Sequence, residues 1–304
     1  PELVPEEPAP SSPVRRPIRR WWALPLILFV ATWASTLARD GLFHALEVGS
    51  EHGIVAGLAA GLVEGMKFAV PLMTILICHE MGHFLQARRY GVYASFPFFI
   101  PMPLSPLGTL GAVIAMEPRI GDRKALFDIG ITGPLAGLVP TLMFCIVGLH
   151  WSEYKVPPQG SMIFGDPLLF QWLTEAVLGP RPPGHDVFVH PMAFAAWAGL
   201  LVTSLNLIPI GQLDGGHILY ALLGKRAHPV AIGLLLSAVL VVVLNLAVYA
   251  PWLLVIVLLI ALGPRHPPTQ NDHVRLGPVR VMLGWLTLAF IVIGFTPQPI
   301  VGVG

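Results

Sequence analysis

The sequence has few charged residues and almost no cysteine. Of its 304 residues, 12% are charged and 55% are hydrophobic, and the mean hydropathy is +0.72. Because a soluble domain is usually about one-quarter charged, this composition predicts a membrane protein. The two cysteines, Cys78 and Cys145, supply neither a disulfide framework nor CxxC metal spacing. No basic cluster interleaved with aromatic residues occurs, so the sequence indicates no nucleic-acid partner.

Long apolar runs separated by polar or basic residues predict an all-α polytopic membrane protein. All of these runs except residues 252–262 are long enough, or nearly so, for a membrane-spanning helix, and together they predict a bundle of about six to seven spans in a lipid bilayer. The expected spans cover residues 21–37, 68–86, 125–149, 191–207, 229–248, 252–262 and 279–295. Residues 167–178 fit an amphipathic helix in a connecting segment.

Three segments near the N-terminus are interpreted from composition. Residues 1–14, rich in Pro, Glu and Ser, are predicted to be a disordered tail. The basic and then apolar residues 15–37 fit either a signal peptide or a retained anchor, and the Trp21–Trp22 pair favours the anchor. The Gly- and Ala-rich residues 53–63 are either a short re-entrant helix or the start of the next span.

Residues 90–117 are apolar but interrupted by prolines and by Gly108 and Gly111, so they cannot form one continuous helix. Aromatic and β-branched residues around a Pro and Gly turn predict two extended segments that fold back as a membrane-associated β-hairpin or loop. An unpaired strand edge in this loop could receive another chain by strand addition. The other interpretation is an interfacial loop without a role in substrate binding.

An HExxH pattern, formed by His79, Glu80 and His83, lies inside the second expected span. Residues four apart share one face of a helix, so the two histidines can bind one ion with Glu80 beside it. A glutamate in apolar surroundings is costly, which indicates a functional site. HExxH also arises by chance, but here it coincides with a membrane helix and with an acidic residue far along the chain.

That acidic residue is Asp214, in the stretch NLIPIGQLDGG after the fourth span. Catalytic zinc usually has three protein ligands of N or O type and a water, and HExxH supplies two of them. Asp214 is the best third ligand in the chain, because Pro209 and the adjacent glycines open the helix there. His217 is a rival ligand; its other interpretation is an interfacial hydrogen-bonding residue.

Two further polar residues have open roles. Asn206 either donates a hydrogen bond to a substrate carbonyl or oxyanion, or holds helices together. Asp128, near one end of the third span, is either functional or a solvated or capped carboxylate.

The distribution of basic residues predicts an orientation. If the first span runs from inside to outside, fourteen of the 18 Lys and Arg residues lie on the cytoplasmic side. The other four are Arg39, Lys67, Lys155 and Arg181. His83 and Asp214 then both lie towards the cytoplasmic face.

HEMGH within a membrane helix, FPFFIPMP, GTLG, GITGPLAG and NLIPIGQLDGG together resemble the site-2 protease family of intramembrane zinc metalloproteases. The similarity covers about residues 65–224 and is strongest to the branch without a PDZ domain, which includes cyanobacterial and chloroplast members. It implies that His79, His83 and Asp214 hold one catalytic Zn²⁺ and that Glu80 is the catalytic base. It further implies that Asn206 steadies substrate or oxyanion.

The resemblance also implies an activity: hydrolysis of a peptide bond in or near the transmembrane segment of a single-span membrane protein. Family substrates include anti-sigma factors and membrane-bound transcription-factor precursors, usually trimmed first by an upstream site-1 type protease. A zinc-handling membrane transporter is the alternative, although a transporter has no use for Glu80 beside the metal. A catalytically inactive binding scaffold is a third class.

The chain is accordingly divided into four parts. After the tail at 1–14, residues 15–64 hold the first span and its connector. Residues 65–226 are expected to form the catalytic membrane core, and residues 227–304 the C-terminal spans.

Overall fold

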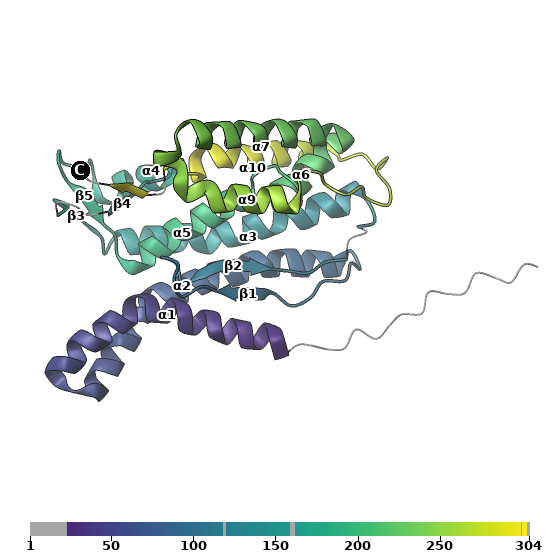
Figure 1. The fold of residues 1–304 in the computed structure, drawn as a ribbon. Helices are drawn as coiled ribbons and strands as arrows, with labels where there is room; N and C mark the ends of the chain where they lie inside the picture. The colour runs from purple at the N-terminus through teal and green to yellow at the C-terminus, as the bar shows by residue number, and fades with distance from the viewer. Residues whose placement is uncertain (1–22, 118–119, 159–161, 299, 303–304) are drawn as a thin grey trace, which may run out of the picture.

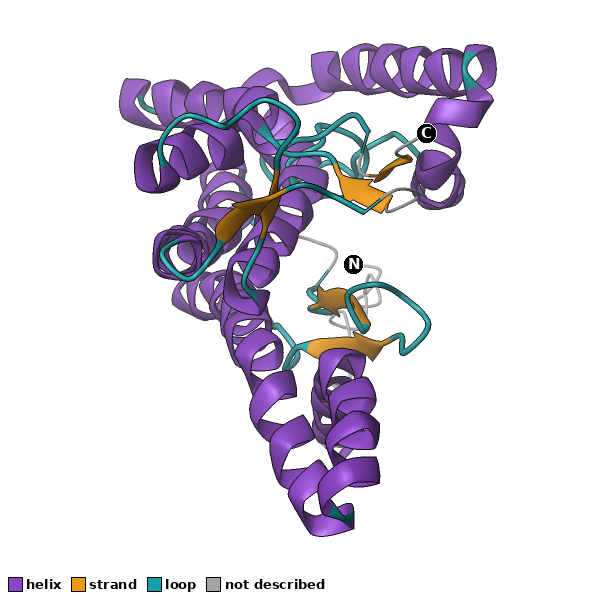
Figure 2. Cartoon of the chain, turned by 90° about the vertical axis from the view of Figure 1, so that its left-hand side faces the viewer, coloured by secondary structure: helices purple, strands orange, loops and turns teal. Residues whose placement is uncertain are grey.

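The computed structural model describes residues 23–117, 120–158, 162–298 and 300–302. In these residues the chain forms a bundle of helices with small two-stranded sheets at its periphery (Figures 1 and 2). The prediction of an all-α polytopic membrane protein is confirmed. The predicted tail at 1–14 and the basic residues at 15–20 lie outside the described residues.

The elements have the following bounds. The helices are α1 (Ala23–His52), α2 (Ile54–Arg89), α3 (Arg123–Leu149), α4 (Leu168–Leu178), α5 (Pro191–Asn206), α6 (Asp214–Leu223), α7 (Ala227–Leu244), α8 (Leu246–Tyr249), α9 (Leu253–Leu262) and α10 (Pro278–Gly294). Short 3₁₀ turns lie at Gly224–Arg226 and Ala250–Trp252. The strands are β1 (Phe98–Pro101), β2 (Thr109–Val113), β3 (Glu153–Lys155), β4 (Met162–Phe164), β5 (Asp186–Phe188) and β6 (Ile300–Gly302).

Within the described residues, four helical segments are long and apolar enough to cross a membrane. They are Ala23–His52, Ile54–Arg89, Arg123–Leu149 and Asp214–Leu244. Shorter apolar helices cover Leu168–Leu178, Pro191–Asn206, Leu246–Leu262 and Pro278–Gly294. The expected spans therefore coincide with helices, while the number of six to seven spans stays a prediction.

Gly53 separates α1 from α2, and residues 54–63 are the beginning of α2, so this segment is the start of the next helix. Gly57, Gly61 and Gly65 lie on one face of α2, and a Cβ at any of them would collide with the backbone of α1. Small residues at this spacing let two helices approach closely, so the helix continues instead of turning back. With 36 residues α2 is about 54 Å long, which exceeds the hydrocarbon core of about 30 Å, and the α1–α2 hairpin extends from the bundle (Figure 1).

The predicted β-hairpin is present as β1 and β2, which pair antiparallel in one sheet. Gly108 in the turn and Gly111 within β2 have φ of 71° and 95°, so both positions need a backbone conformation that glycine adopts freely. Ser35 of α1 donates a hydrogen bond to the carbonyl of Gly108 at 2.6 Å. At the base of the hairpin, Phe96 stacks on Phe84 of α2 with ring centroids 5.5 Å apart. The hairpin thus lies against α1 and reaches the turn of α2 that follows His83.

The core lies where α2, α3 and α5 meet, in the middle of the bundle (Figure 1). Most of its fully buried residues are apolar side chains from all three helices, such as Leu72, Leu126 and Leu200. By contrast, α7 and α9 expose large apolar side chains, among them Leu236 and Leu258. Exposed apolar surface of this extent is what a lipid-facing helix requires.

Candidate metal centre

The HExxH residues lie on the second half of α2, where this helix is covered by α3 and α5. His79, Glu80 and His83 are 3%, 5% and 6% exposed. Burial of two imidazoles and a carboxylate in an apolar bundle is costly unless they have partners. Among the described residues, the carboxylate of Glu80 forms no hydrogen bond or ion pair, which sets it apart from the two histidines.

Asp214 reaches the histidines because α6 begins with it. The chain leaves α5 after Asn206 and turns through a non-helical segment in which Gly211 has φ of 59°. Gly215 and Gly216 lie so close to the backbone of residues 207–211 that a Cβ at either position would collide with it. The glycines predicted to open the helix therefore allow a tight turn, which directs the carboxylate at the start of α6 towards α2.

Three side chains from distant parts of the sequence meet at one point. Nε2 of His79 lies 3.2 Å from Oδ2 of Asp214, and Nε2 of His83 lies 3.2 Å from Oδ1. The two Nε2 atoms are 3.3 Å apart. In the described part of the chain these are the residues that gather metal-ligand atoms within 4.8 Å of one another.

This arrangement fits a zinc ion. Atoms that bind zinc tetrahedrally at about 2.0–2.1 Å lie about 3.3 Å from one another, as these three do. Two imidazole nitrogens and a carboxylate oxygen also form the ligand set of a catalytic zinc site, which leaves a fourth position for water. Without a cation, two unprotonated Nε2 atoms at this separation would repel each other.

The ring of His83 is held by α3. Its Nδ1 donates a hydrogen bond of 2.7 Å to the carbonyl of Ile129, which leaves Nε2 free to bind a metal. Gly133 and Gly137 of α3 make room for the two imidazoles, because a Cβ at Gly133 would overlap the ring of His83 and one at Gly137 would touch Cβ of His79. The small residues of the run GITGPLAG therefore leave space for the two imidazole rings, in addition to allowing close helix packing.

Asn206 is the last residue of α5, and its Nδ2 lies 3.2 Å from Nε2 of His79. The amide thus borders the group formed by His79, His83 and Asp214, at a distance where it can contact a molecule bound there. This position is compatible with substrate contact and with helix pairing, so both interpretations remain predictions.

His217, the rival metal ligand, forms a hydrogen bond with another histidine. Its Nδ1 lies 2.6 Å from Nε2 of His266, in the loop between α9 and α10. Nδ1 of His266 is 2.5 Å from the carbonyl of Pro267, so this nitrogen donates and the bond from His217 is accepted by Nε2. His217 therefore has the hydrogen-bonding role that was one of its two interpretations.

The structure adds two contacts that the sequence did not reveal. His266 is 7% exposed although it lies in the loop between α9 and α10, where the sequence shows two histidines in a polar segment and nothing that indicates burial. Asp128 accepts two hydrogen bonds of 2.8 Å from Arg280 of α10, and Tyr90 donates a third of 2.5 Å. Asp128 is thus an ion-paired carboxylate that joins three helical elements, rather than a solvated or capped one.

Comparison with known proteins gives matches to zinc metalloproteases. The rice (Oryza sativa subsp. japonica) "Probable zinc metalloprotease EGY1, chloroplastic" is 37% identical over 171 residues, which cover 53% of this chain and 29% of the relative. The Arabidopsis thaliana protein with the same description is 33% identical over 242 residues, which cover 76% of this chain and 43% of the relative. The chain spans less than half the length of these relatives. No solved structure matches it.

A protein-family model gives the broadest assignment. The model described as peptidase family M50 matches residues 67–247, a stretch that includes the HExxH residues of α2, the hairpin, α3, α5 and Asp214. This stretch is more than half of the chain. The chain therefore belongs to peptidase family M50, the site-2 protease family that its motifs resemble.

Proposed function

We propose that the chain is an intramembrane zinc metalloprotease that hydrolyses a peptide bond in or near the transmembrane segment of a single-span membrane protein. The observation that carries this proposal is the meeting of His79, His83 and Asp214, with ligand atoms 3.2–3.3 Å apart, inside a bundle of apolar helices. The family and the zinc metalloproteases among its relatives support it.

In this proposal the three residues hold one Zn²⁺. When bound there, zinc supplies Lewis acidity, which polarises a peptide carbonyl and makes water acidic near neutral pH. The hydrogen bond from Nδ1 of His83 to Ile129 keeps its ring in the orientation and tautomer that binding requires. Gly133 and Gly137 keep the space that the rings occupy.

Glu80 is the general base. It neighbours His79 on α2, is 5% exposed, and has no partner among the described residues that would hold its carboxylate elsewhere. It takes the proton from the attacking water and then gives it to the leaving amine. Asn206, beside His79, donates to the substrate carbonyl as negative charge develops on it.

A transmembrane helix hides its carbonyls in hydrogen bonds and must unwind locally before hydrolysis. The hairpin of β1 and β2 is a two-stranded sheet, so each strand has one edge free of the other. An unwound substrate segment pairs with such an edge and stays extended while the bond is cut. Phe96, stacked on Phe84, places the base of the hairpin next to the turn of α2 that carries His83.

We assign the active site to the cytoplasmic side. Among the described residues, Arg88 and Arg89 end α2, Arg123 begins α3, and Arg280 lies in the first turn of α10. The ion pair of Arg280 with Asp128 puts the starts of α3 and α10 at one end of the bundle. Basic residues concentrated at one end are typical of the cytoplasmic face.

The substrate class that we propose is supported by the resemblance to the family and by the need for a single span that can unwind. We expect anti-sigma factors or membrane-bound transcription-factor precursors, first shortened by a site-1 type protease. The four-part division of the chain, with the catalytic core at residues 65–226, belongs to the same proposal.

The test compares wild type with Glu80→Gln in proteoliposomes that contain a model single-span peptide. The expected result is one zinc per chain in both proteins and cleavage by wild type only. The control is Glu64→Gln, which changes another α2 carboxylate, ion-paired with Lys67, and should cleave normally. Normal cleavage by Glu80→Gln with zinc retained would eliminate Glu80 as the base. Zinc uptake into the vesicles without cleavage would favour the transporter instead.

A further inference from the structure

A second cavity lies at the other end of the bundle from the proposed zinc site. It has two adjoining lobes, of about 240 Å³ and about 350 Å³, that share Phe164 and Asp166. We call the first the aromatic lobe and the second the acidic lobe. The aromatic lobe is lined by five aromatic side chains, which are Phe164, Phe170, Phe188, Phe194 and Trp197.

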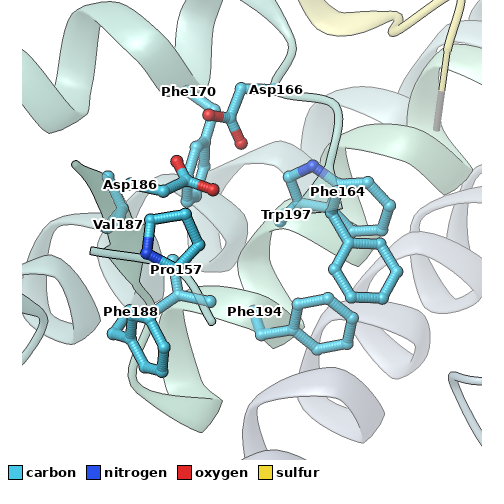
Figure 3. A pocket seen from close by; sticks show the side chains of 10 residues that line it. Pro157, Phe164, Asp166, Phe170, Asp186, Val187, Phe188, Phe194 and Trp197 are labelled. Carbon is cyan, nitrogen blue, oxygen red and sulfur yellow. The ribbon is translucent and has the colours of Figure 1, made fainter. Parts of the chain in front are cut away.

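The aromatic lobe has one wall of packed rings. The rings of Phe194 and Trp197 stack with centroids 5.4 Å apart, and the edge of Phe164 meets Trp197 at 5.3 Å. Figure 3 shows the carboxylates of Asp166 and Asp186 directed towards each other at the side of this lobe away from Phe194. A ligand with an apolar body and a cationic end suits such a mixture of rings and carboxylates.

The charges of the two lobes are not balanced. Arg181 forms ion pairs with Asp166 at 3.1 Å and with Asp186 of the aromatic lobe at 3.2 Å, and Glu175 is the second carboxylate of the acidic lobe. Burial raises the pKa of Asp166 to about 6 although Arg181 opposes the shift. The other cations nearby are already paired, Lys155 with Glu153 and Arg39 with Asp40. Lys155 and Arg39 also lie over the rings of Phe188 and Phe194. Within the acidic lobe, Arg181 is ion-paired with Asp166, and no described residue pairs with the carboxylate of Glu175, which leaves room for a cation there.

Thr174 gives an independent indication of a ligand. It lines the acidic lobe, is 2% exposed, and its hydroxyl has no hydrogen-bond partner in the described part of the chain. A threonine within a helix commonly donates to a carbonyl one turn earlier, which this one does not do. Buried hydroxyls without partners are rare in native proteins and are usually satisfied by water or a ligand.

Helix α5 connects this cavity to the proposed zinc site. Trp197 lines the aromatic lobe, and Asn206, nine residues later on the same helix, borders His79. At the helical rise, nine residues correspond to about 14 Å. A polypeptide that follows α5 can therefore reach both places with about nine residues in a helix or about four in an extended segment.

We infer that the two lobes bind a Lys or Arg side chain of the membrane polypeptide that the enzyme cleaves, with the stem against the aromatic rings and the cation among Asp166, Glu175 and Thr174. The identity of this polypeptide as the substrate rests on the proposed function. A basic residue held about 14 Å from the zinc site would fix which bond of the substrate reaches Glu80.

The inference is tested by binding, without cleavage, on the full chain carrying Glu80→Gln in detergent. The probes are synthetic single-span peptides that are identical except for Lys or Gln at one end of the apolar segment. The expected result is that the Lys peptide binds about fivefold tighter or more. Glu175→Gln and Thr174→Val, each made in the same background, should both abolish this difference.

The control is Glu51→Gln, which removes an exposed carboxylate of α1 that lines neither lobe and is ion-paired with the neighbouring His52. It should keep the preference for Lys. Thr174→Val conserves shape and removes an unpartnered hydroxyl, so its melting temperature should not fall. Equal affinity for both peptides, or a preference that survives Glu175→Gln and Thr174→Val, would overturn the inference. Binding of the Lys peptide by a wild-type chain that never cuts it would overturn the protease proposal alone.

Discussion

Gly133 of α3 faces His83 of α2 so closely that a Cβ at position 133 would overlap the imidazole ring. One turn earlier on α3, the carbonyl of Ile129 accepts the hydrogen bond from Nδ1 of the same ring. The backbone of α3 thus both orients His83 and leaves it the space it occupies. We conclude that α3 is part of the proposed metal centre although it contributes no ligand atom.

Replacement of Gly133 by alanine should displace His83 and weaken zinc binding. The affinity should fall by about 10- to 100-fold, the range found when supports of metal ligands are lost. Zinc competition with a chelator measures this change. The matched control is Gly233→Ala in α7, where a Cβ meets nothing within 4 Å, and it should leave zinc affinity unchanged. Unaltered zinc binding by Gly133→Ala would show that α3 does not fix the ring.

Asn206→Ala separates the two interpretations of this residue. If the amide stabilises charge on the substrate, kcat should fall by about 10²- to 10³-fold while zinc content and melting temperature stay unchanged. If it only joins helices, the melting temperature should fall while kcat is conserved. Ser204→Ala is a suitable control, because the Ser204 hydroxyl on the same helix is buried without a hydrogen-bond partner among the described residues.

Sequence patterns predicted those parts of the site that depend on local spacing. His79 and His83 lie four residues apart on one helix, and the glycines after Asp214 predicted the opening from which its carboxylate emerges. The partners of His217 and Asp128 could not be predicted in this way. His266 and Arg280 lie 49 and 152 residues away from them in the sequence, and no local spacing links either residue to its partner.

The start of α2 illustrates the same limit. From composition, residues 53–63 could be either a re-entrant helix or the start of the next span. Glycine has a low intrinsic helix propensity, so the local sequence does not predict a long continuous helix here. Contact with α1 decides the matter, since only glycine at positions 57, 61 and 65 lets the two backbones meet. This contact is made with a neighbouring helix, so it cannot be predicted from the sequence of residues 53–63 alone.

Stability should depend on pH through Asp166. Burial raises its pKa to about 6 from 3.8, against the effect of Arg181 and with a contribution from Asp186. Below about pH 4 the group is protonated in both the folded and unfolded states, and between about pH 4 and 6 the unfolded state loses its proton first. The folded state therefore loses on the order of 3 kcal/mol as pH rises through this window.

Melting temperatures of wild type and Asp166→Asn between pH 4 and 7 measure this effect. The variant cannot titrate at this position, so the difference between the two proteins should change with pH in that window. A constant difference would mean that Asp166 ionises in the folded protein as it does in the unfolded chain.

The stability that the Arg280–Asp128 ion pair provides should depend on the planar shape of the guanidinium group. Arg280 donates two hydrogen bonds of 2.8 Å, one to each carboxylate oxygen, which an ammonium group cannot reproduce. Because the pair is partly exposed, Arg280→Lys should cost only about 0.5–1 kcal/mol. Thermal unfolding measures this loss, and in an Asp128→Asn background the same substitution should cost much less.

The most direct measurement is X-ray absorption at the zinc edge of the purified full chain, with zinc quantified in the same sample. We expect one zinc per chain with a shell of N and O atoms at about 2.0–2.1 Å, two of them from imidazole. The imidazole signal should fall in His83→Ala, and zinc should be lost when His79, His83 and Asp214 are replaced together. A stoichiometric zinc that survives the triple replacement, or one with sulfur ligands, would contradict the account.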